Sequence, residues 1–92
     1  MKQVIRNTNQ LGTVIRNMRI TNGLIQKELA TKTNLRQATI SKLESGDDGT
    51  KLKTLFEILN ALDLEIIIQK RTTFSHSEYM RILSILNDEE KK

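Results

Sequence analysis

The chain of 92 residues contains no cysteine and a single histidine, and none of its apolar runs approaches the length of a membrane span. Without cysteine there is no disulfide framework and no thiolate metal site, and His76 alone cannot assemble a multi-histidine site. A membrane-crossing helix needs roughly 20 apolar residues, and the N-terminal sequence MKQVIRNTNQ lacks the apolar core of a signal peptide. We therefore expect a cytoplasmic protein with no cofactor and no membrane association.

The chain also offers little from which to build an enzyme. A protein of this length usually forms a single domain. It buries only roughly two-thirds of the surface that its unfolded chain exposes, which leaves little room for an enclosed catalytic pocket. Glu28 and Glu44 are the only acids among the first 46 residues, and no cysteine or histidine stands near them to complete an acid-base pair. The sequence therefore argues against catalysis and against a small-molecule substrate.

Acidic residues are scarce in the N-terminal half. Residues 1–46 contain eight Lys or Arg against two Glu, a net charge of +6, whereas residues 47–92 contain seven against nine acids, a net charge of −2. A basic excess by itself usually indicates only a solvated face. Concentrated in one half of the chain, it favours a polyanionic partner for that half, because phosphate neutralisation supplies most sequence-independent affinity for nucleic acid.

Residues 26–43, QKELATKTNLRQATISKL, have the spacing of a DNA-reading helix-turn-helix. Asn34 stands where the chain turns, and Asn is the residue after Gly that best accepts a positive φ, because its short amide bonds locally. We expect helices over about residues 26–32 and 37–45 on either side of this turn. The residues expected to form the shared core of the two helices are Leu29, Ala30, Ile40 and Leu43.

The second of these helices has an apolar side and a small, polar side. At about 100° per residue, Ile40 and Leu43 fall on one side, opposite Ala38 and Ser41. Side chains able to bond base edges cluster in the first turn, which is the end that enters a DNA groove. The expected base-reading residues are Arg36, Gln37, Ala38, Thr39 and Ser41.

Two further helices are expected to flank the motif. Asn7 and Gln10 resemble a capping box that begins a helix ending near Asn22. Thr50 is expected to cap a fourth helix, which ends near Asp63 and closes the core with an apolar stripe. The residues of that stripe are Leu52, Leu55, Phe56, Ile58, Leu59, Ala61 and Leu62.

The residues after the fourth helix have a high strand preference, and no second strand of comparable quality appears elsewhere in the chain. An unpaired strand exposes a row of backbone donors and acceptors, so we expect this segment to pair with its copy in a second subunit. A strand folded onto its own chain, or a continued helix, is the alternative. The expected dimer strand consists of Glu65, Ile66, Ile67, Ile68, Gln69 and Lys70.

A fifth, amphipathic helix is expected over residues 74–87, with Ser75 and Glu78 as a capping box at its start. Its apolar stripe is narrow. Spacing alone leaves open whether the dimer partner, the chain's own core or another protein covers this stripe. The stripe consists of Tyr79, Ile82, Leu83 and Leu86.

Residues 11–46, with LGTVIRNMR, LIQKELA and RQATISKLESG, resemble the Cro and phage-repressor helix-turn-helix family, also called the Xre family. More narrowly, QATIS, the LKTLFEILNALDLE helix and the strand after it resemble HipB-type antitoxins, which repress their own operon and bind a HipA-type kinase toxin. The resemblance implies a mainly α fold of four to five helices, with one C-terminal strand pairing across a homodimer.

The resemblance also assigns roles to individual side chains. In this family an Arg near the end of the first helix pairs with a Glu late in the third, and Arg19 and Glu44 occupy those places. Two unrelated surface charges are the alternative. Gln26 matches the family's phosphate-binding glutamine, although Ile25 replaces the Ser or Thr that usually caps this helix. Further expected phosphate-binding residues are Lys42, Ser45, Lys51 and Lys53.

The resulting hypothesis is a homodimer that inserts two recognition helices into successive major grooves of an inverted-repeat operator and blocks transcription. The narrower likeness adds a kinase toxin that the dimer holds inactive. The alternatives are a stand-alone phage or host repressor, and a protein-interaction module that has lost DNA binding. The expected organisation is an N-terminal arm (1–8), a DNA-binding domain (9–63), a dimerisation strand (64–71), the C-terminal helix (74–87) and a charged tail (88–92).

Overall fold

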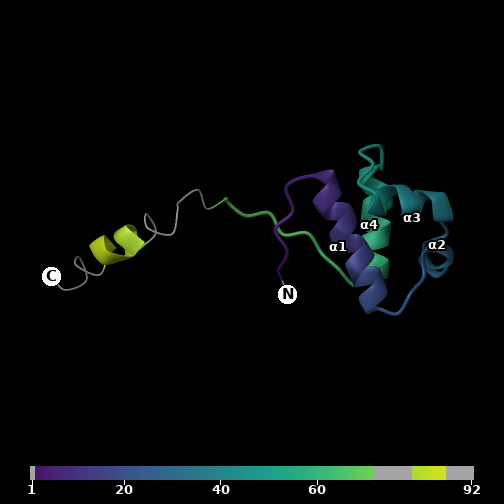
Figure 1. Cartoon of the computed structure of the whole chain (residues 1–92), viewed down its shortest axis with the longest axis horizontal. Coiled ribbons are helices and arrows are strands. Elements are labelled where there is room, and N and C mark those ends of the chain that lie inside the picture. The colour runs from purple at the N-terminus through teal and green to yellow at the C-terminus, as the bar shows by residue number, and fades with distance from the viewer. Residues whose placement is uncertain (1, 72–79, 87–92) are drawn as a thin grey trace.

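A computed structural model describes residues 2–71 and 80–86, and among these residues four helices pack into one body with extended segments at its ends (Figure 1). Residues 80–86 are also helical, and no strand occurs in the described ranges. None of the described helices is both long and apolar enough to cross a bilayer. The bounds are α1 Thr8–Thr21, α2 Gln26–Thr33, α3 Gln37–Glu44 and α4 Leu52–Ala61.

The start of α1 is fixed by side-chain caps. Asn7 Oδ1 accepts a hydrogen bond from the backbone N–H of Gln10 at 2.8 Å, as the sequence predicts. The reciprocal bond falls one residue earlier than in a capping box, because Gln10 Oε1 accepts from the N–H of Arg6 at 2.7 Å. Two backbone donors that lack helical partners are thereby satisfied, and the chain before α1 is tied to the helix.

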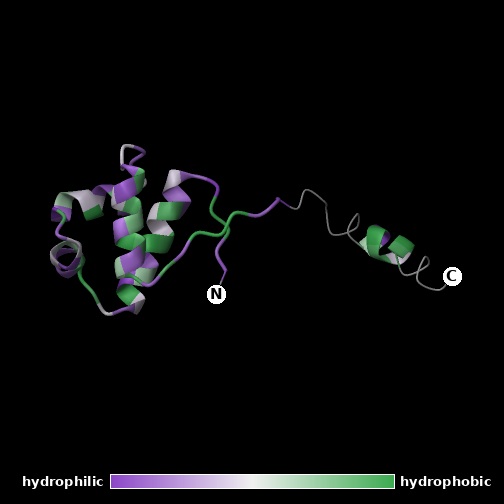
Figure 2. Ribbon diagram, turned by 180° about the vertical axis from the view of Figure 1, so that it is seen from behind, coloured by the Kyte–Doolittle hydropathy of each residue, from purple (hydrophilic) through white to green (hydrophobic). Residues whose placement is uncertain are grey.

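All four helices of the body contribute to one apolar core, and Figure 2 shows hydrophobic and hydrophilic residues alternating along them. The core residues predicted for the helix-turn-helix are all buried. In α4 the prediction was partly wrong, because Leu52 is exposed and Phe56 remains 47% exposed. The buried core consists of Ile15, Leu29, Ala30, Ile40, Leu43, Leu55, Ile58, Leu59 and Leu62.

Residues with left-handed backbone end the helices of the body. Asn34 has φ 56° and ψ 36° at the end of α2, which confirms its predicted role in the turn. Asp63 has φ 56° after α4, and the backbone N–H of Leu64 bonds back to the carbonyl of Leu59 at 2.8 Å. Gly46 has φ 90° after α3, and a Cβ there would clash with the side-chain oxygen of Asn9.

Helices α1 and α3 approach most closely at Gly12. A Cβ on Gly12 would clash with the carbonyl oxygen of Leu43 and would lie 2.7 Å from that of Glu44. Only hydrogen fits there, so α3 rests with its last turn directly on the backbone of α1. Helix α3 is therefore positioned by a backbone contact as well as by side chains.

The predicted cap of α4 was wrong. The N-cap residue is Lys51, which makes no side-chain cap bond, and the first helical bond runs from the N–H of Leu55 to the carbonyl of Lys51 at 3.0 Å. A capping side chain must belong to the residue that directly precedes the helix. Thr50 lies one residue too early to fill that position.

The two extended segments face each other across two pockets, which residues 3–6 and 65–71 line, and the first of these pockets lies beside the core. Residues 65–71 are not in a strand within this single chain, so pairing with a second subunit stays a prediction. In the C-terminal helix Ile82 and Leu83 are half-buried, and Leu86 is exposed. The predicted cap residues Ser75 and Glu78, the stripe residue Tyr79 and the tail 88–92 lie outside the described residues.

Candidate nucleic-acid interface

The outward side of α3 is left exposed by the described residues. Ile40 and Leu43 are buried against the body, whereas Gln37, Ala38 and Ser41 are exposed. Thr39, which was also predicted to read bases, is half-buried in the first turn. Helix α3 therefore presents small and polar side chains on its exposed side, and its opposite side is packed into the core.

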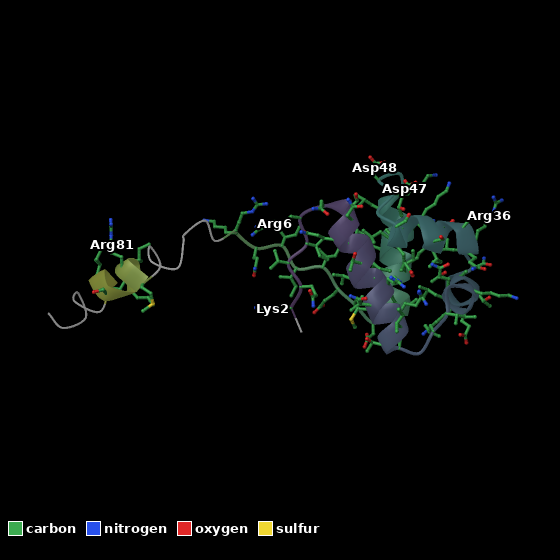
Figure 3. All side chains as sticks on the ribbon, viewed as in Figure 1. Lys2, Arg6, Arg36, Asp47, Asp48 and Arg81 are labelled. Carbon is green, nitrogen blue, oxygen red and sulfur yellow. The ribbon has the colours of Figure 1, made fainter. Side chains whose placement is uncertain are left out.

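Arg36 precedes α3 as its N-cap residue and makes no side-chain cap bond. Figure 3 shows its side chain extending away from the four-helix body. The guanidinium is thus available at the helix end that carries Gln37. A guanidinium at this place can reach either a base edge or a phosphate.

The predicted phosphate-binding residues lie on three elements and are exposed, except for Gln26, which is half-buried. Lys42 and Ser45 stand near the end of α3, and the Ser45 hydroxyl donates to the carbonyl of Lys42 at 2.8 Å. Lys51 and Lys53 stand at the start of α4. Asp47 and Asp48 lie between the two pairs, in the loop that Figure 3 shows projecting from one end of the body. The positive charge is therefore interrupted by two acids at the loop tip.

The side chains of Arg19 and Glu44 meet inside the body as a bidentate ion pair. Arg19 Nε donates to Glu44 Oε2 at 2.7 Å and Arg19 Nη2 donates to Oε1 at 3.0 Å, while their side chains are 10% and 3% exposed. The hydrogen bond to Glu44 raises the pKa of Arg19 above its ordinary value, against the opposing effect of burial. The third donor, Nη1, bonds the carbonyl of Leu24 at 2.7 Å.

Gln26 is joined to the same pair. Its Nε2 donates to Glu44 Oε1 at 3.2 Å, so the first residue of α2 is tied to the last residue of α3. Within the described residues no buried side-chain nitrogen or oxygen lacks a partner. The network therefore connects α1, the loop at Leu24, the start of α2 and the end of α3 with every buried polar group satisfied.

The start of α2 at Ile25 has only one half of a capping box. Ile25 has no polar side chain and is 59% exposed, so it contributes neither a cap nor core packing. Glu28 Oε1 instead accepts from the backbone N–H of Ile25 at 3.0 Å, which is one half of a capping box. The N–H groups of the first turn itself receive no side-chain cap.

Sequence reasoning missed two features of this interface. The first is Gly12, whose signal is a glycine inside an otherwise regular amphipathic helix. The second is the bond between Gln26 and Glu44, which has no sequence signal because it depends on how α2 and α3 are placed. As for metals, the described part of the chain contains no group of three or more His, Asp or Glu side chains that could hold an ion.

Comparison with known proteins gives a consistent family assignment. Residues 15–68 match the helix-turn-helix family HTH_3. The antitoxin HipB of Escherichia coli K12 is 41% identical over 66 residues, which cover 72% of this chain and 75% of that protein. The antitoxin HipB of the Escherichia coli strain CFT073 has the same identity over 70% of its length.

Solved structures of similar proteins include complexes of HipB. The HipB-O4 20mer complex matches with 38% identity and a TM-score of 0.72, covering 77% of this chain and all of that one. The HipA-HipB-O2-O3 complex matches with the same identity, TM-score and coverage. The restriction-modification controller protein C.AhdI from Aeromonas hydrophila is 28% identical, with a TM-score of 0.59 over 63% of this chain and 88% of its own.

Proposed function

Because this chain belongs to the Xre-type helix-turn-helix family HTH_3, we propose that it binds operator DNA as a homodimer and represses transcription. The observation that carries this proposal is the bare outward side of α3. Gln37, Ala38 and Ser41 are exposed there above the buried Ile40 and Leu43. A helix anchored on one side and presenting small polar groups on the other fits the major groove.

The proposed readout assigns one chemical task to each side chain at the start of α3. Gln37 bonds an adenine through both ends of its amide, and the methyl group of Ala38 contacts a thymine methyl. Arg36 bonds a guanine or a neighbouring phosphate. Ser41 adds a hydroxyl one turn later, and the half-buried Thr39 contributes less than its neighbours because less of it faces outward.

Backbone binding is assigned to residues that surround this helix. Lys42, Lys51 and Lys53 supply mobile positive charge, and Ser45 a hydroxyl donor. Gln26 stands at the uncapped start of α2, where the free N–H groups of the first turn favour an anion. These contacts hold the protein on the duplex without reading its sequence.

The proposed dimer forms through residues 65–70. If these strands pair antiparallel about a twofold axis between Ile67 and Ile68, Glu65 lies opposite the partner subunit's Lys70, which places opposite charges side by side. Ile68 is 94% exposed in the single chain, and no backbone hydrogen bond joins this segment to another of the described residues. A second copy of the strand would satisfy the backbone groups along one edge of this segment and would pack Ile67 against the partner subunit's Ile68.

We further propose that the chain is the antitoxin of a HipBA-like toxin-antitoxin operon, with a HipA-like kinase as its partner. The support is its similarity to HipB antitoxins and to the HipA-HipB-O2-O3 complex. The proposed partner face is the stripe that includes Ile82, Leu83 and Leu86, together with Tyr79 outside the described residues. A stand-alone phage or host repressor without a toxin partner is the competing function, because a controller protein outside the HipB group, C.AhdI, has a similar fold.

Fluorescence anisotropy with the DNA upstream of the chain's own gene tests the DNA proposal. We expect the upstream duplex to bind at least about 1,000-fold more tightly than a shuffled duplex of the same composition at physiological salt. Equal affinity for both duplexes would contradict specific readout and favour an interaction module. Co-expression with the neighbouring reading frame then separates antitoxin from lone repressor, since only an antitoxin retains that second protein through purification.

A further inference from the structure

The carboxylate of Glu44 serves two neighbours at once. Arg19 of α1 donates to both carboxylate oxygens, at 2.7 and 3.0 Å, and Gln26 Nε2 of α2 donates to Oε1 at 3.2 Å. The Glu44 side chain is only 3% exposed, so these protein donors replace nearly all of its water. The ion pair explains the contact with Arg19, but it does not explain why Gln26 joins it.

The contact with Glu44 fixes which way round the Gln26 amide lies. A carboxylate only accepts hydrogen bonds, so Nε2 must face it, and the carbonyl oxygen of the amide must face elsewhere. One N–H of Nε2 is used by Glu44. The other N–H of Nε2 can still donate to a further acceptor. The chain just before α2 is held in place separately, because Arg19 bonds the carbonyl of Leu24 at 2.7 Å.

Resting on the proposed phosphate contact of Gln26, we propose that Glu44 is a positioning residue for DNA binding, which orients the Gln26 amide so that its second N–H meets a phosphate. A phosphate oxygen also only accepts, so an amide turned the other way would present its carbonyl and be repelled. Glu44 disfavours that orientation before DNA arrives. Arg19 neutralises the carboxylate, which allows a negative group to stand behind a phosphate-binding residue.

A double-mutant cycle in operator binding tests this coupling. Glu44→Asp keeps the negative charge but withdraws the carboxylate by one methylene from both Gln26 and Arg19, and only the loss at Gln26 depends on Gln26 being present. We expect Glu44→Asp to weaken binding of the dimer about 5- to 150-fold, because one ordered side chain is released in each of the two protomers. In a Gln26→Ala background the same change should leave the Kd within about twofold, because the residue to be oriented is gone.

The controls separate this inference from the proposed function. Glu57→Asp shortens an acid of α4 and should leave the Kd unchanged. If Gln26→Ala binds as tightly as the unchanged chain, the phosphate contact fails, and this inference fails with it. If Gln26→Ala weakens binding but Glu44→Asp weakens it equally with and without Gln26, the phosphate contact stands and only the positioning role is overturned.

A second measurement needs neither DNA nor a variant. Side-chain ¹⁵N relaxation of the free protein compares the amide of Gln26 with that of Gln37, which is exposed in the first turn of α3. We expect the Gln26 amide to be the more restricted of the two on the picosecond to nanosecond timescale. Equal mobility of the two amides would overturn the positioning role even if Glu44→Asp does not fold.

Discussion

Arg19→Ala is the most informative change for stability, because it removes three hydrogen bonds from the centre of the helix network. Arg19 is 8% exposed and bonds both oxygens of Glu44 and the carbonyl of Leu24. Among the described residues, its removal leaves Glu44 with Gln26 as the one remaining donor. Breaking a buried ion pair by removing one partner costs about 3–5 kcal/mol, which is a large share of the roughly 5–15 kcal/mol that holds a small domain folded.

Thermal and urea unfolding of Arg19→Ala measure this cost. We expect the melting temperature to fall by more than about 10 °C in a domain of this size. Arg16→Ala is the matched control, since Arg16 lies exposed on the same helix, and it should change stability by less than about 0.5 kcal/mol. The double variant Arg19→Met with Glu44→Leu should recover much of the loss, because it leaves no buried charge unpaired.

The direction in which the pKa of Arg19 is shifted determines how the stability lost in Arg19→Ala depends on pH. The hydrogen bond to Glu44 raises the pKa of Arg19 above its already high ordinary value. The stabilisation by the ion pair is therefore complete below the pKa that Arg19 has in the unfolded state. It is lost only as the pH rises through the pKa of Arg19 in the folded state, so the ionisation of Arg19 adds no pH dependence near neutrality.

If Arg19→Ala and Arg16→Ala melt at the same temperature, the ion pair of Arg19 with Glu44 does not stabilise the fold, and the reasoning is refuted.

Three further changes test the packing, the readout and the dimer. Gly12→Ala should destabilise the fold by about 1–3 kcal/mol in urea unfolding, although Ala has the better helix propensity. Asn17→Ala, on the exposed side of α1, should not destabilise it. Equal stability of the two variants would contradict the close approach of α1 to α3. Gln37→Ala should relax base preference by about 1–3 kcal/mol at one symmetry-related pair of operator positions in a binding selection, and an unchanged preference would remove Gln37 from the readout. Ile67→Asp should make the protein monomeric in sedimentation equilibrium. Ile20→Asp, at an exposed isoleucine of α1, should leave the dimer intact. Identical behaviour of the two variants would argue against a dimer that forms through residues 65–70.

Features that depend on local chemistry were predictable from the sequence. Asn34 adopts the expected left-handed backbone because only its own side chain and the following turn decide that conformation. Asn7 caps α1 for the same reason, since the bond spans only three residues. The alternation of apolar and polar residues determined which sides of α2 and α3 are buried, because both helices are short and packed on one side.

Features that depend on how the helices are placed were not predictable. Helical spacing predicted that Leu52 and Phe56 would be buried in the core together with Leu55. They remain exposed because the other helices of the body do not reach far enough to cover them. The clash that any Cβ at Gly12 would meet comes from carbonyl groups of α3, which are distant from Gly12 in the chain. Gln26 is likewise tied to Glu44 across the turn.

The account depends on a dimer that presents two copies of α3 to successive major grooves. Hydroxyl-radical footprinting of the chain on the DNA upstream of its own gene measures this directly. We expect two protected half-sites on one face of the duplex, arranged as an inverted repeat with centres about 10 base pairs or a multiple of that apart. A single protected half-site, or protection spread evenly along the duplex, would contradict the account.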